Sequence, residues 1–400
     1  MKPVLMVSDV YFPRINGVST SMESFRRALE QMGQEVRLVV PRYGDEADEP
    51  GVVRVAGRRV PGDPEDRLVR WRAMHRVVEE QAACCGLIHV QTPFVAHYAG
   101  LRAARRLGLP VVATYHTLFE EYLEHYAPFL PAGWLRARAR GFSRGQCNAL
   151  DAVIVPSSAM RQRLEGYGVT APMKVLPTGI PLGQFTRGDG AAFRRRHGIA
   201  AGRPVALFVG RLAHEKNIGF LLDALPHALR LLPEMLLLIA GEGPAEQDLK
   251  RQVESLGLAG SVLFVGYLDR VGELPDCYAA ADVFAFSSRT ETQGLVLLEA
   301  MASGVPVVAL SAMGTTDILA PGRGCRIAPD DPLGFGETMA HVLGRHGLRA
   351  QLADHARRYA QEWSDRAMAE RLLGVYQNLA AGQRLPDATA ADGTMAARRL

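Results

Sequence analysis

The pattern of hydrophobic and polar positions divides the chain into short apolar runs and longer amphipathic stretches. The apolar runs are rich in Val and Ile, which favour strands, and most are followed by a segment with helical periodicity. This alternation predicts parallel sheets in an α/β protein. Strands are expected at 4–9, 35–41, 51–56, 87–91, 110–116, 152–157, 173–180, 205–211, 235–243, 262–268, 282–288 and 306–310.

The helical segments between these runs show that the strand–helix cycle restarts once. Helices are expected at 20–33, 67–82, 99–108, 134–149, 217–232, 244–257 and 359–380. The cycle restarts near 182–203, which predicts two α/β domains of similar size, 1–185 and 186–358. The tail 381–400 is rich in Ala, Gly and Pro and is expected to be disordered.

The charge of the chain is small but unevenly distributed. A net charge of +4 over 400 residues does not indicate a nucleic-acid partner. Residues 1–185 carry 23 Lys and Arg against 18 Asp and Glu, which suits an anionic surface such as a membrane. A solvated surface explains the same excess.

The cysteines and the N-terminus indicate a cytosolic protein. Five cysteines, an odd number without CxxC spacing, predict reduced thiols and neither a zinc site nor a disulfide framework. No apolar stretch reaches the ~18–20 residues that a membrane-spanning helix needs. Asp9 lies where a signal peptide would need apolar residues, so the N-terminus predicts a first strand.

Unusual residues follow several strands, at the edge of a parallel sheet where ligands bind. Gly17 precedes a helix expected to start near Ser19, where phosphate could approach the backbone. An ordinary turn explains Gly17 equally well, and the loop lacks both GxGxxG and GxxxxGK[ST]. His116 ends the run 110–116, although a lone histidine is more often structural than catalytic.

Arg211 and Lys216 lie beside the end of the strand at 205–211, where Arg offers a planar guanidinium and Lys a point charge. Two cations there suit a diphosphate. The alternative is a surface salt-bridge cluster with Glu215. The sequence at 241–244, GEGP, predicts a tight turn at the next strand end.

Glu291 and Glu299 stand eight positions apart, just before and within an otherwise apolar helical segment. A buried carboxylate costs several kcal/mol when it is charged and unpaired. We therefore expect a hydroxyl-rich ligand to compensate Glu299. Eight helical steps turn the chain about 80° beyond two full turns, so both acids are expected to border one cleft.

Five motifs together resemble the family-4 retaining glycosyltransferases. They are YFPRINGVS, VLPTGI, GRLAHEKN, GEGP and SSRTETQGLVLLEAMASGVPVVA, which contains the family's Glu-x7-Glu pattern. The resemblance covers roughly residues 2–380. It implies the GT-B fold, in which two Rossmann-like parallel-sheet domains face each other across a cleft. In that fold the last helix crosses back to the first domain, a role that suits 359–380.

The resemblance also assigns roles to residues of this chain. It implies that the second domain binds a nucleotide-sugar donor and the first binds the acceptor. Arg211 and Lys216 would hold the diphosphate, and Glu299 the ribose. Glu291 would hold the sugar hydroxyls. The other implied donor contacts are Gly17, Gly210, Tyr267, Leu268, Gln293, Gly294 and Leu295, with His116 near the reacting carbon.

The implied catalytic residues are His116, Arg211, Lys216 and Glu291. Fixed cations would stabilise the negative charge that develops on the leaving diphosphate. Because diphosphate is already a good leaving group, the reaction needs no general acid. No cofactor is implied, and no dedicated metal site is evident, so a divalent metal would at most stimulate the reaction.

The acceptor is suggested by residues 115–131, YHTLFEEYLEHYAPFLP, which include Tyr115. They resemble the corresponding stretch of bacterial glucosyltransferases acting on diacylglycerol, which implies UDP-glucose as donor and a membrane lipid as acceptor. Two basic helices with a Trp could lie on an anionic membrane; a solvated basic face explains either helix alone. Their residues are Arg67, Arg70, Trp71, Arg72 and Arg76, and Arg136, Arg140 and Arg144.

This interpretation places the protein in the cytoplasm, in peripheral contact with the inner face of the cytoplasmic membrane. The main alternative is a GDP-mannose-dependent α-mannosyltransferase that builds a polysaccharide or glycolipid, because the motifs do not determine the donor base. A GT-B-fold sugar-nucleotide epimerase and a non-catalytic binding protein are further alternatives. The intact residues Arg211, Lys216, Glu291 and Glu299 argue against both.

Overall fold

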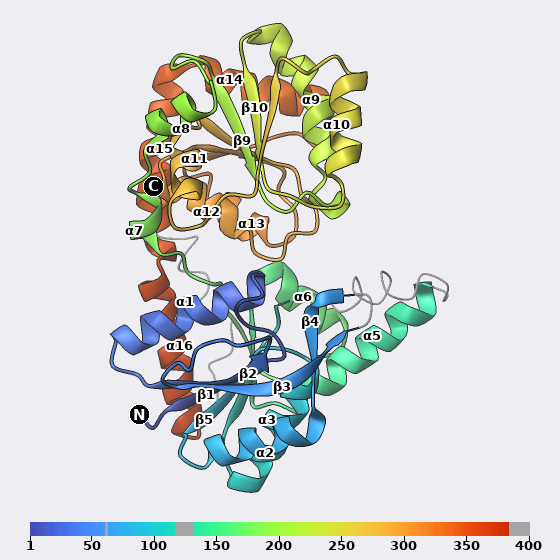
Figure 1. The fold of residues 1–400 in the computed structure, drawn as a ribbon, viewed down its shortest axis with the longest axis vertical. Helices are drawn as coiled ribbons and strands as arrows, with labels where there is room; N and C mark the ends of the chain where they lie inside the picture. Colours follow the sequence, from blue (N-terminus) through green and yellow to red (C-terminus); the bar gives the residue numbers. More distant parts are fainter. Residues whose placement is uncertain (61–62, 117–131, 384–400) are drawn as a thin grey trace. The chain divides into compact units, whose positions relative to one another are not determined.

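The computed structural model describes residues 1–60, 63–116 and 132–383, and the chain divides into two compact units (Figure 1). Unit 1 comprises Met1–Gly179 and Asp365–Leu400, and unit 2 comprises Ile180–Ser364. The chain thus passes between the units a few residues away from the boundaries expected at 185 and 358. The tail from 384 lies outside the described residues.

Unit 1 is built on a sheet whose described strands run in the order β4-β3-β2-β1-β5-β6-β7-β8. All neighbouring pairs are parallel except β3 and β4. The order reverses between β1 and β5, as in doubly wound folds. The strands are β1 Val4–Val7, β2 Val36–Arg42, β3 Val52–Val60, β4 Asp63–Val69, β5 Leu87–Val90, β6 Val111–Thr114, β7 Ala152–Val155 and β8 Met173–Val175.

Helices cover both faces of this sheet. The helices α1 and α16 lie on one side of it, and α2 and α3 on the other (Figure 1). Alternate residues of the strands supply the two cores: Val4 and Met6 pack with α1 and α16. The described helices of unit 1 are α1 Gly17–Gln31, α2 Trp71–Ala82, α3 Val95–Leu107, α5 Ala132–Cys147, α6 Ser158–Gly166 and α16 Asp365–Ala380.

Unit 2 is built on a fully parallel sheet of order β11-β10-β9-β12-β13-β14, which reverses between β9 and β12. This is the Rossmann arrangement. The strands are β9 Val205–Val209, β10 Leu236–Ala240, β11 Val262–Gly266, β12 Val283–Phe286, β13 Val307–Ala309 and β14 Cys325–Ile327. The helices are α7 Leu182–Phe185, α8 Gly190–Arg196, η1 His214–Lys216, α9 Ile218–Leu231, α10 Glu246–Ser255, α11 Glu273–Ala279, α12 Leu295–Ala302, α13 Thr315–Leu319, α14 Pro332–Gly344, α15 His346–Ala360 and η2 Gln361–Trp363.

Two helix predictions were wrong in their extent. The segment 67–82 begins in strand β4, where Arg67 pairs with Arg59 of β3, and only from Trp71 is it a helix. The segment 359–380 is interrupted by η2, so α16 begins at Asp365. In both cases one amphipathic pattern runs across more than one element, and apolar spacing alone does not mark the break.

The helix α16 belongs to unit 1 and contributes Met368, Leu372 and Tyr376 to its core. Buried His89 of β5 joins it to the sheet: its Nδ1 lies 2.6 Å from the Tyr376 hydroxyl and its Nε2 lies 2.7 Å from Thr114 Oγ1. Burial lowers the pKa of His89 to about 3. The imidazole is therefore neutral in the folded protein at neutral pH.

Acidification is expected to destabilise the protein through His89. The unfolded chain takes up this proton near pH 6.5, whereas the folded chain does so only near the pKa of about 3. Stability is therefore lost as pH falls below about 6.5, by about 1.4 kcal/mol per pH unit. Urea unfolding measures how much the free energy of unfolding falls between about pH 7.5 and about pH 5. This decrease should be about 2 kcal/mol smaller in His89→Gln than in the wild type. An identical loss in both proteins would refute this assignment.

Candidate active site

In unit 2, the candidate site residues cluster at the carboxyl edge of the sheet, where its strand order reverses. Arg211 and Lys216 follow β9, and Glu291 follows β12. The strands β9 and β12 are neighbours on either side of the reversal. The loops after such strands diverge to opposite sides and leave space for a ligand between them.

Glycines bring the backbones of three strand ends into contact at this edge. The amide of Gly210 donates to the Ala240 carbonyl at 3.0 Å, and that of Gly241 donates to the Gly266 carbonyl at 2.8 Å. A Cβ on Gly241 would overlap the carbonyl oxygen of Gly210, so a side chain cannot be accommodated there. Glycine is thus required at the first position of the GEGP turn, because the Gly210 backbone packs directly against it.

Lys216 and Glu291 form an ion pair that joins the two loops. The distance from Lys216 Nζ to Glu291 Oε2 is 2.7 Å, and the side chains are 24% and 19% exposed. A partly buried, charge-assisted hydrogen bond of this length fixes both groups. The pair thus presents a cation and a carboxylate together, which suits phosphate and hydroxyl groups respectively.

Asn217 and Ser287 hold this pair in place, and the sequence interpretation missed both. Asn217 Nδ2 donates to the Ser287 carbonyl at 3.0 Å, and Ser287 Oγ donates to the Asn217 carbonyl at 2.9 Å. Asn217 has φ of 56°, a left-handed conformation that Asn tolerates better than most residues. An Asn directly after Lys216 was the sequence signal for this turn.

Arg211 makes the contact that the alternative interpretation proposed. Its Nη2 lies 2.9 Å from Glu215 Oε1, and both side chains are exposed. An exposed ion pair contributes only about 0–1 kcal/mol, so the guanidinium can exchange Glu215 for a phosphate at little cost. The surface pair and a diphosphate role are therefore compatible.

Glu299 is compensated by protein groups, which corrects the expectation that ligand hydroxyls do so. The residue is 2% exposed within α12. Its Oε1 accepts from Arg270 Nη2 at 2.6 Å, and its Oε2 accepts from the Tyr278 hydroxyl at 2.8 Å. Arg270 follows β11 and Tyr278 lies on α11, and neither had been identified from the sequence. The buried charge is thus neutralised by contacts distant in sequence.

The remaining expected donor contacts also lie at this carboxyl edge. Gly294 has φ of 95° and precedes α12, which Leu295 begins; Gln293 is buried. Tyr267 and Leu268 directly follow β11, with Tyr267 exposed and Leu268 buried. The structure therefore brings the expected donor contacts of the second half of the chain to one edge of the unit 2 sheet.

In unit 1, the corresponding edge carries His116 and the half-buried acid Asp9. His116 Nε2 lies 2.9 Å from Gln91 Oε1, and burial lowers the pKa of His116 to about 4. Asp9, after β1, accepts from Thr92 Oγ1 at 2.7 Å and from the Ala96 amide at 3.0 Å. Burial raises the pKa of Asp9 to about 6. His116 is thus neutral at neutral pH and suited to accept or donate a hydrogen bond.

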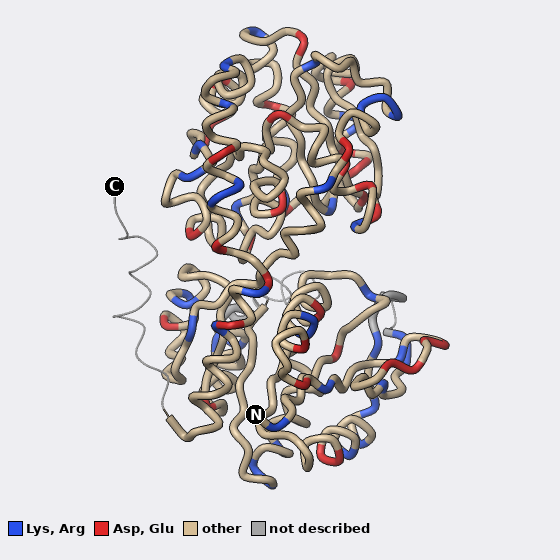
Figure 2. The backbone as a smooth tube through the Cα atoms, turned by 90° about the vertical axis from the view of Figure 1, so that its left-hand side faces the viewer, with Lys and Arg blue, Asp and Glu red and all other residues tan. Residues whose placement is uncertain are grey.

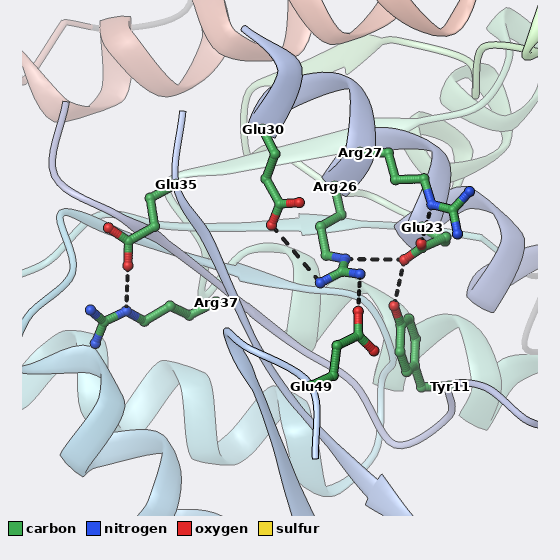
Figure 3. A network of polar contacts seen from close by, with 8 residues as sticks. All are labelled: Tyr11, Glu23, Arg26, Arg27, Glu30, Glu35, Arg37 and Glu49. Carbon is green, nitrogen blue, oxygen red and sulfur yellow. Dashed lines mark hydrogen bonds and ion pairs between the residues drawn. The ribbon is translucent and has the colours of Figure 1, made fainter. Parts of the chain in front are cut away.

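The loop between β1 and α1 is fixed by a network of polar contacts (Figure 3). The Tyr11 hydroxyl donates to Glu23 Oε2 at 2.6 Å, and Arg26 Nε donates to the same oxygen at 3.1 Å. Arg26 also pairs with Glu49. Gly17 begins α1, slightly earlier than expected, and a Cβ there would meet open space. The loop is thus anchored while Gly17 itself stays accessible.

The expected membrane residues lie on several elements of unit 1. Arg67 donates to the Tyr43 carbonyl at 3.2 Å from strand β4, and Arg70 immediately precedes α2, so neither lies on the expected helix. Trp71 is 50% exposed, and the centre of its ring lies 5.6 Å from that of Tyr98, with the two ring planes tilted by 38°. A hollow of about 690 Å³ beside it is lined by residues of α2 and α3, including Arg72, Arg76 and Arg102.

A second basic hollow, of about 470 Å³, lies against α5. Arg140 and Arg144 line it together with Tyr167, and the Arg140 guanidinium lies 5.5 Å from the centre of that ring. The Tyr115 hydroxyl lies 2.9 Å from Ser143 Oγ on the same helix. The side chain of Arg136 and residues 117–131 of the expected acceptor stretch lie outside the described residues.

Within the described parts of the chain, no helix is both long and apolar enough to span a bilayer. The same residues contain no group of three or more His, Cys, Asp or Glu side chains arranged to hold a metal ion.

Comparisons with known proteins identify both halves of the chain as parts of a glycosyltransferase. Residues 189–359 match the family model for glycosyl transferases group 1, and residues 15–184 match that for Glycosyltransferase Family 4. The chain is 34% identical over 322 residues to alpha-monoglucosyldiacylglycerol synthase of Streptococcus pneumoniae, covering 76% of this chain and 70% of the relative.

Two further matches cover nearly the whole chain. The GDP-mannose-dependent alpha-mannosyltransferase of Mycobacterium tuberculosis is 29% identical over 392 residues, which are 94% of this chain and 96% of the relative. The structure of Anabaena Alr3699/HepE in complex with UDP-glucose matches with a TM-score of 0.73 and 20% identity, over 94% of this chain and 100% of that chain. This likeness confirms the predicted fold.

Proposed function

The chain belongs to the group 1 and family 4 glycosyltransferases and is a hexosyltransferase of the GT-B fold, and from this premise we propose its substrates. The donor is UDP-glucose, and glucose is transferred with retention of the anomeric configuration. The acceptor is a membrane lipid such as diacylglycerol. The epimerase and the non-catalytic alternatives are set aside by family membership.

The observation that carries hexose transfer from a diphosphate donor is the Lys216–Glu291 pair at the reversal point of the unit 2 sheet. Breaking the bond between the anomeric carbon and the diphosphate oxygen leaves negative charge on the diphosphate. Lys216, with Arg211 beside it, provides fixed positive charge there, which is the largest single source of rate enhancement in many enzymes. Glu291 accepts hydrogen bonds from the sugar hydroxyls and so orients the hexose.

The two units have different roles in this proposal. Unit 2 binds the donor, with Tyr267 and Leu268 at the base and Glu299 at the ribose. Unit 1 binds the acceptor, and neutral His116 contacts the hexose near its reacting carbon. Gly17 lets the diphosphate approach the backbone at the start of α1.

The name of the Streptococcus pneumoniae relative supports glucose and diacylglycerol as substrates. The main alternative is GDP-mannose-dependent mannosyl transfer, which is supported by the near-complete alignment with the Mycobacterium tuberculosis enzyme. The two donors share the diphosphate and the ribose and differ in base and sugar. They are therefore distinguished by the loop after β11, where the base would lie, and not by Lys216 or Glu299.

A donor screen tests this choice. The full-length protein is incubated with radiolabelled UDP-glucose or GDP-mannose and a bacterial lipid extract. Label from UDP-glucose in the organic phase supports the proposal. Label from GDP-mannose alone establishes the alternative, and label from neither donor contradicts both.

We also propose that unit 1 contacts an anionic membrane at the inner face of the cytoplasmic membrane. The exposed side chains of Leu68, Trp71, Phe94 and Tyr98 provide apolar surface. Arg72 and Arg76 provide positive charge in a hollow that Glu79 and Glu80 also line, and Arg76 Nε lies 3.8 Å from Glu80 Oε1. Figure 2 shows basic and acidic positions interspersed along the backbone. Binding would therefore depend on this local patch rather than on overall charge.

The protein is expected to float with phosphatidylglycerol vesicles at low salt and much less with phosphatidylcholine vesicles. Each basic residue near an anionic surface contributes about 1 kcal/mol, so reversing both charges in the Arg72→Glu/Arg76→Glu variant should weaken binding at least about tenfold. The Arg251→Glu variant, on α10 of unit 2, serves as the control. Absence of flotation with anionic vesicles at low salt would contradict the membrane proposal.

A further inference from the structure

We infer that Arg270 and Tyr278 determine the ribose selectivity of the donor site by holding the Glu299 carboxylate in one orientation. This inference rests on the proposed function and deepens it, because it concerns how the nucleotide is recognised. It does not depend on the donor base, since uridine and guanosine nucleotides carry the same ribose.

Three separate elements converge on the carboxylate of Glu299. Glu299 lies on α12, Tyr278 on α11 and Arg270 in the loop between β11 and α11. The Arg270 carbonyl accepts a hydrogen bond from the Gln184 side chain of α7, which anchors that loop. The position of the carboxylate is thus fixed by contacts from outside its own helix.

Tyr278 contributes a rigid, permanently protonated donor. It is fully buried, with its ring 5.8 Å from that of Phe185 and 5.9 Å from that of Phe284. Burial, and next the charge of Glu299, raise the pKa of Tyr278 well above its ordinary value. Its hydroxyl therefore donates to Glu299 Oε2 and does not compete as an anion.

Arg270 neutralises the charge of Glu299 and lies in the same loop as the residues proposed to contact the base. Its side chain is 35% exposed, whereas that of Glu299 is 2% exposed, so Arg270 lies between the buried carboxylate and solvent. The charge of Glu299 is the first cause of the raised pKa of Arg270. Arg270 follows Tyr267 and Leu268 closely in the same loop. One loop is thus positioned to contact the base and to orient the ribose-binding acid.

The geometry leaves acceptor capacity for a vicinal diol. A carboxylate has about four acceptor positions, and Arg270 and Tyr278 use one on each oxygen. Each oxygen therefore retains capacity for one hydroxyl of the ribose. Without Arg270 the carboxylate would keep only Tyr278 as a fixed partner and could rotate away from the diol. Arg270 and Tyr278 act through Glu299 and are positioning residues.

The test compares a ribonucleotide with its deoxy analogue. Calorimetric titration of the full-length wild type should show UDP binding about 10–100-fold more tightly than 2′-deoxy-UDP, the size expected for a hydrogen bond to a charged group. If the donor is a guanosine nucleotide, GDP and 2′-deoxy-GDP replace them. Arg270→Ala should reduce this ratio to about threefold or less, and Arg270→Lys and Tyr278→Phe should give intermediate ratios. Arg251→Ala, an exposed arginine of α10, should leave it unchanged.

The outcomes separate this inference from the proposed function. Arg270→Ala that retains the wild-type ratio overturns the inference, and so does a wild type that binds both nucleotides equally. If the wild type binds neither UDP nor GDP, the proposed function fails as well. If Arg270→Ala does not fold, Arg270→Lys and Tyr278→Phe serve as the test. The inference is overturned if both variants keep the wild-type ratio of affinities for the ribonucleotide and its 2′-deoxy analogue.

Discussion

Replacing Lys216 with alanine is expected to lower kcat about 10³-fold with the fold intact. In the proposed reaction the diphosphate leaves with its full negative charge, and Lys216 is the partly buried cation closest to Glu291. A cation that acts mainly on developing charge affects kcat more than donor affinity. The expected loss corresponds to about 4 kcal/mol of transition-state stabilisation.

The control for this variant is Lys250→Ala. Lys250 forms an exposed ion pair with Glu246 on α10, at 2.7 Å, so the same chemical change is made away from the edge that carries Lys216. Thermal unfolding should be nearly unchanged in Lys250→Ala, because an exposed ion pair contributes about 1 kcal/mol or less. Lys216→Ala should remain folded but lose about 1.5–3 kcal/mol of stability, because it removes a charge-assisted hydrogen bond whose side chains are only 24% and 19% exposed. A Lys216→Ala enzyme with turnover close to wild type at saturating donor would refute the diphosphate role.

Replacing Glu299 with alanine is expected to raise the Kd for the nucleotide-sugar donor about 10²-fold and to lower stability. Two hydrogen bonds from ribose hydroxyls to a carboxylate are lost, each worth about 1.5 kcal/mol. The substitution also leaves Arg270 and the buried Tyr278 hydroxyl without the acceptor that both now share. We expect this to cost about 2 kcal/mol, less than for a fully buried pair because Arg270 reaches solvent.

The variant Glu299→Gln separates the two effects. It keeps the shape and one acceptor oxygen, so it should fold better than Glu299→Ala while still binding the donor more weakly than wild type. Calorimetry gives the Kd and urea unfolding gives the stability. An unchanged Kd in a folded Glu299→Ala protein would remove the ribose assignment.

Much of the fold could be predicted because its strands are short, apolar and buried on both faces. The runs at 4–9 and 205–211 are of this kind, and both form central strands of parallel sheets. Strand β4 could not be predicted, because its residues alternate poorly and it is defined by pairing with β3. The apolar sequence pattern is sufficient to predict a buried strand, whereas an edge strand also depends on pairing with its neighbour.

Some residues of the candidate site could also be predicted from local sequence, whereas others depend on tertiary packing. Lys216 and Glu291 were predicted because each follows a strand, and parallel strands place their ends on one edge of a sheet. Arg270 and Tyr278 were missed because their relation to Glu299 depends on how α11 packs against α12. The expectation that a ligand compensates Glu299 failed for this reason: the sequence shows a buried acid but not its distant partners.

A transfer assay with the wild-type enzyme and Lys216→Ala tests hexose transfer to lipid directly. Both proteins are incubated with radiolabelled UDP-glucose and diacylglycerol in phosphatidylglycerol vesicles, and the lipid product is extracted and its anomeric configuration determined by NMR. We expect α-linked glucolipid from the wild type and about 10³-fold less from the variant. A wild type that transfers no hexose to lipid, or a product with inverted configuration, would contradict this expectation.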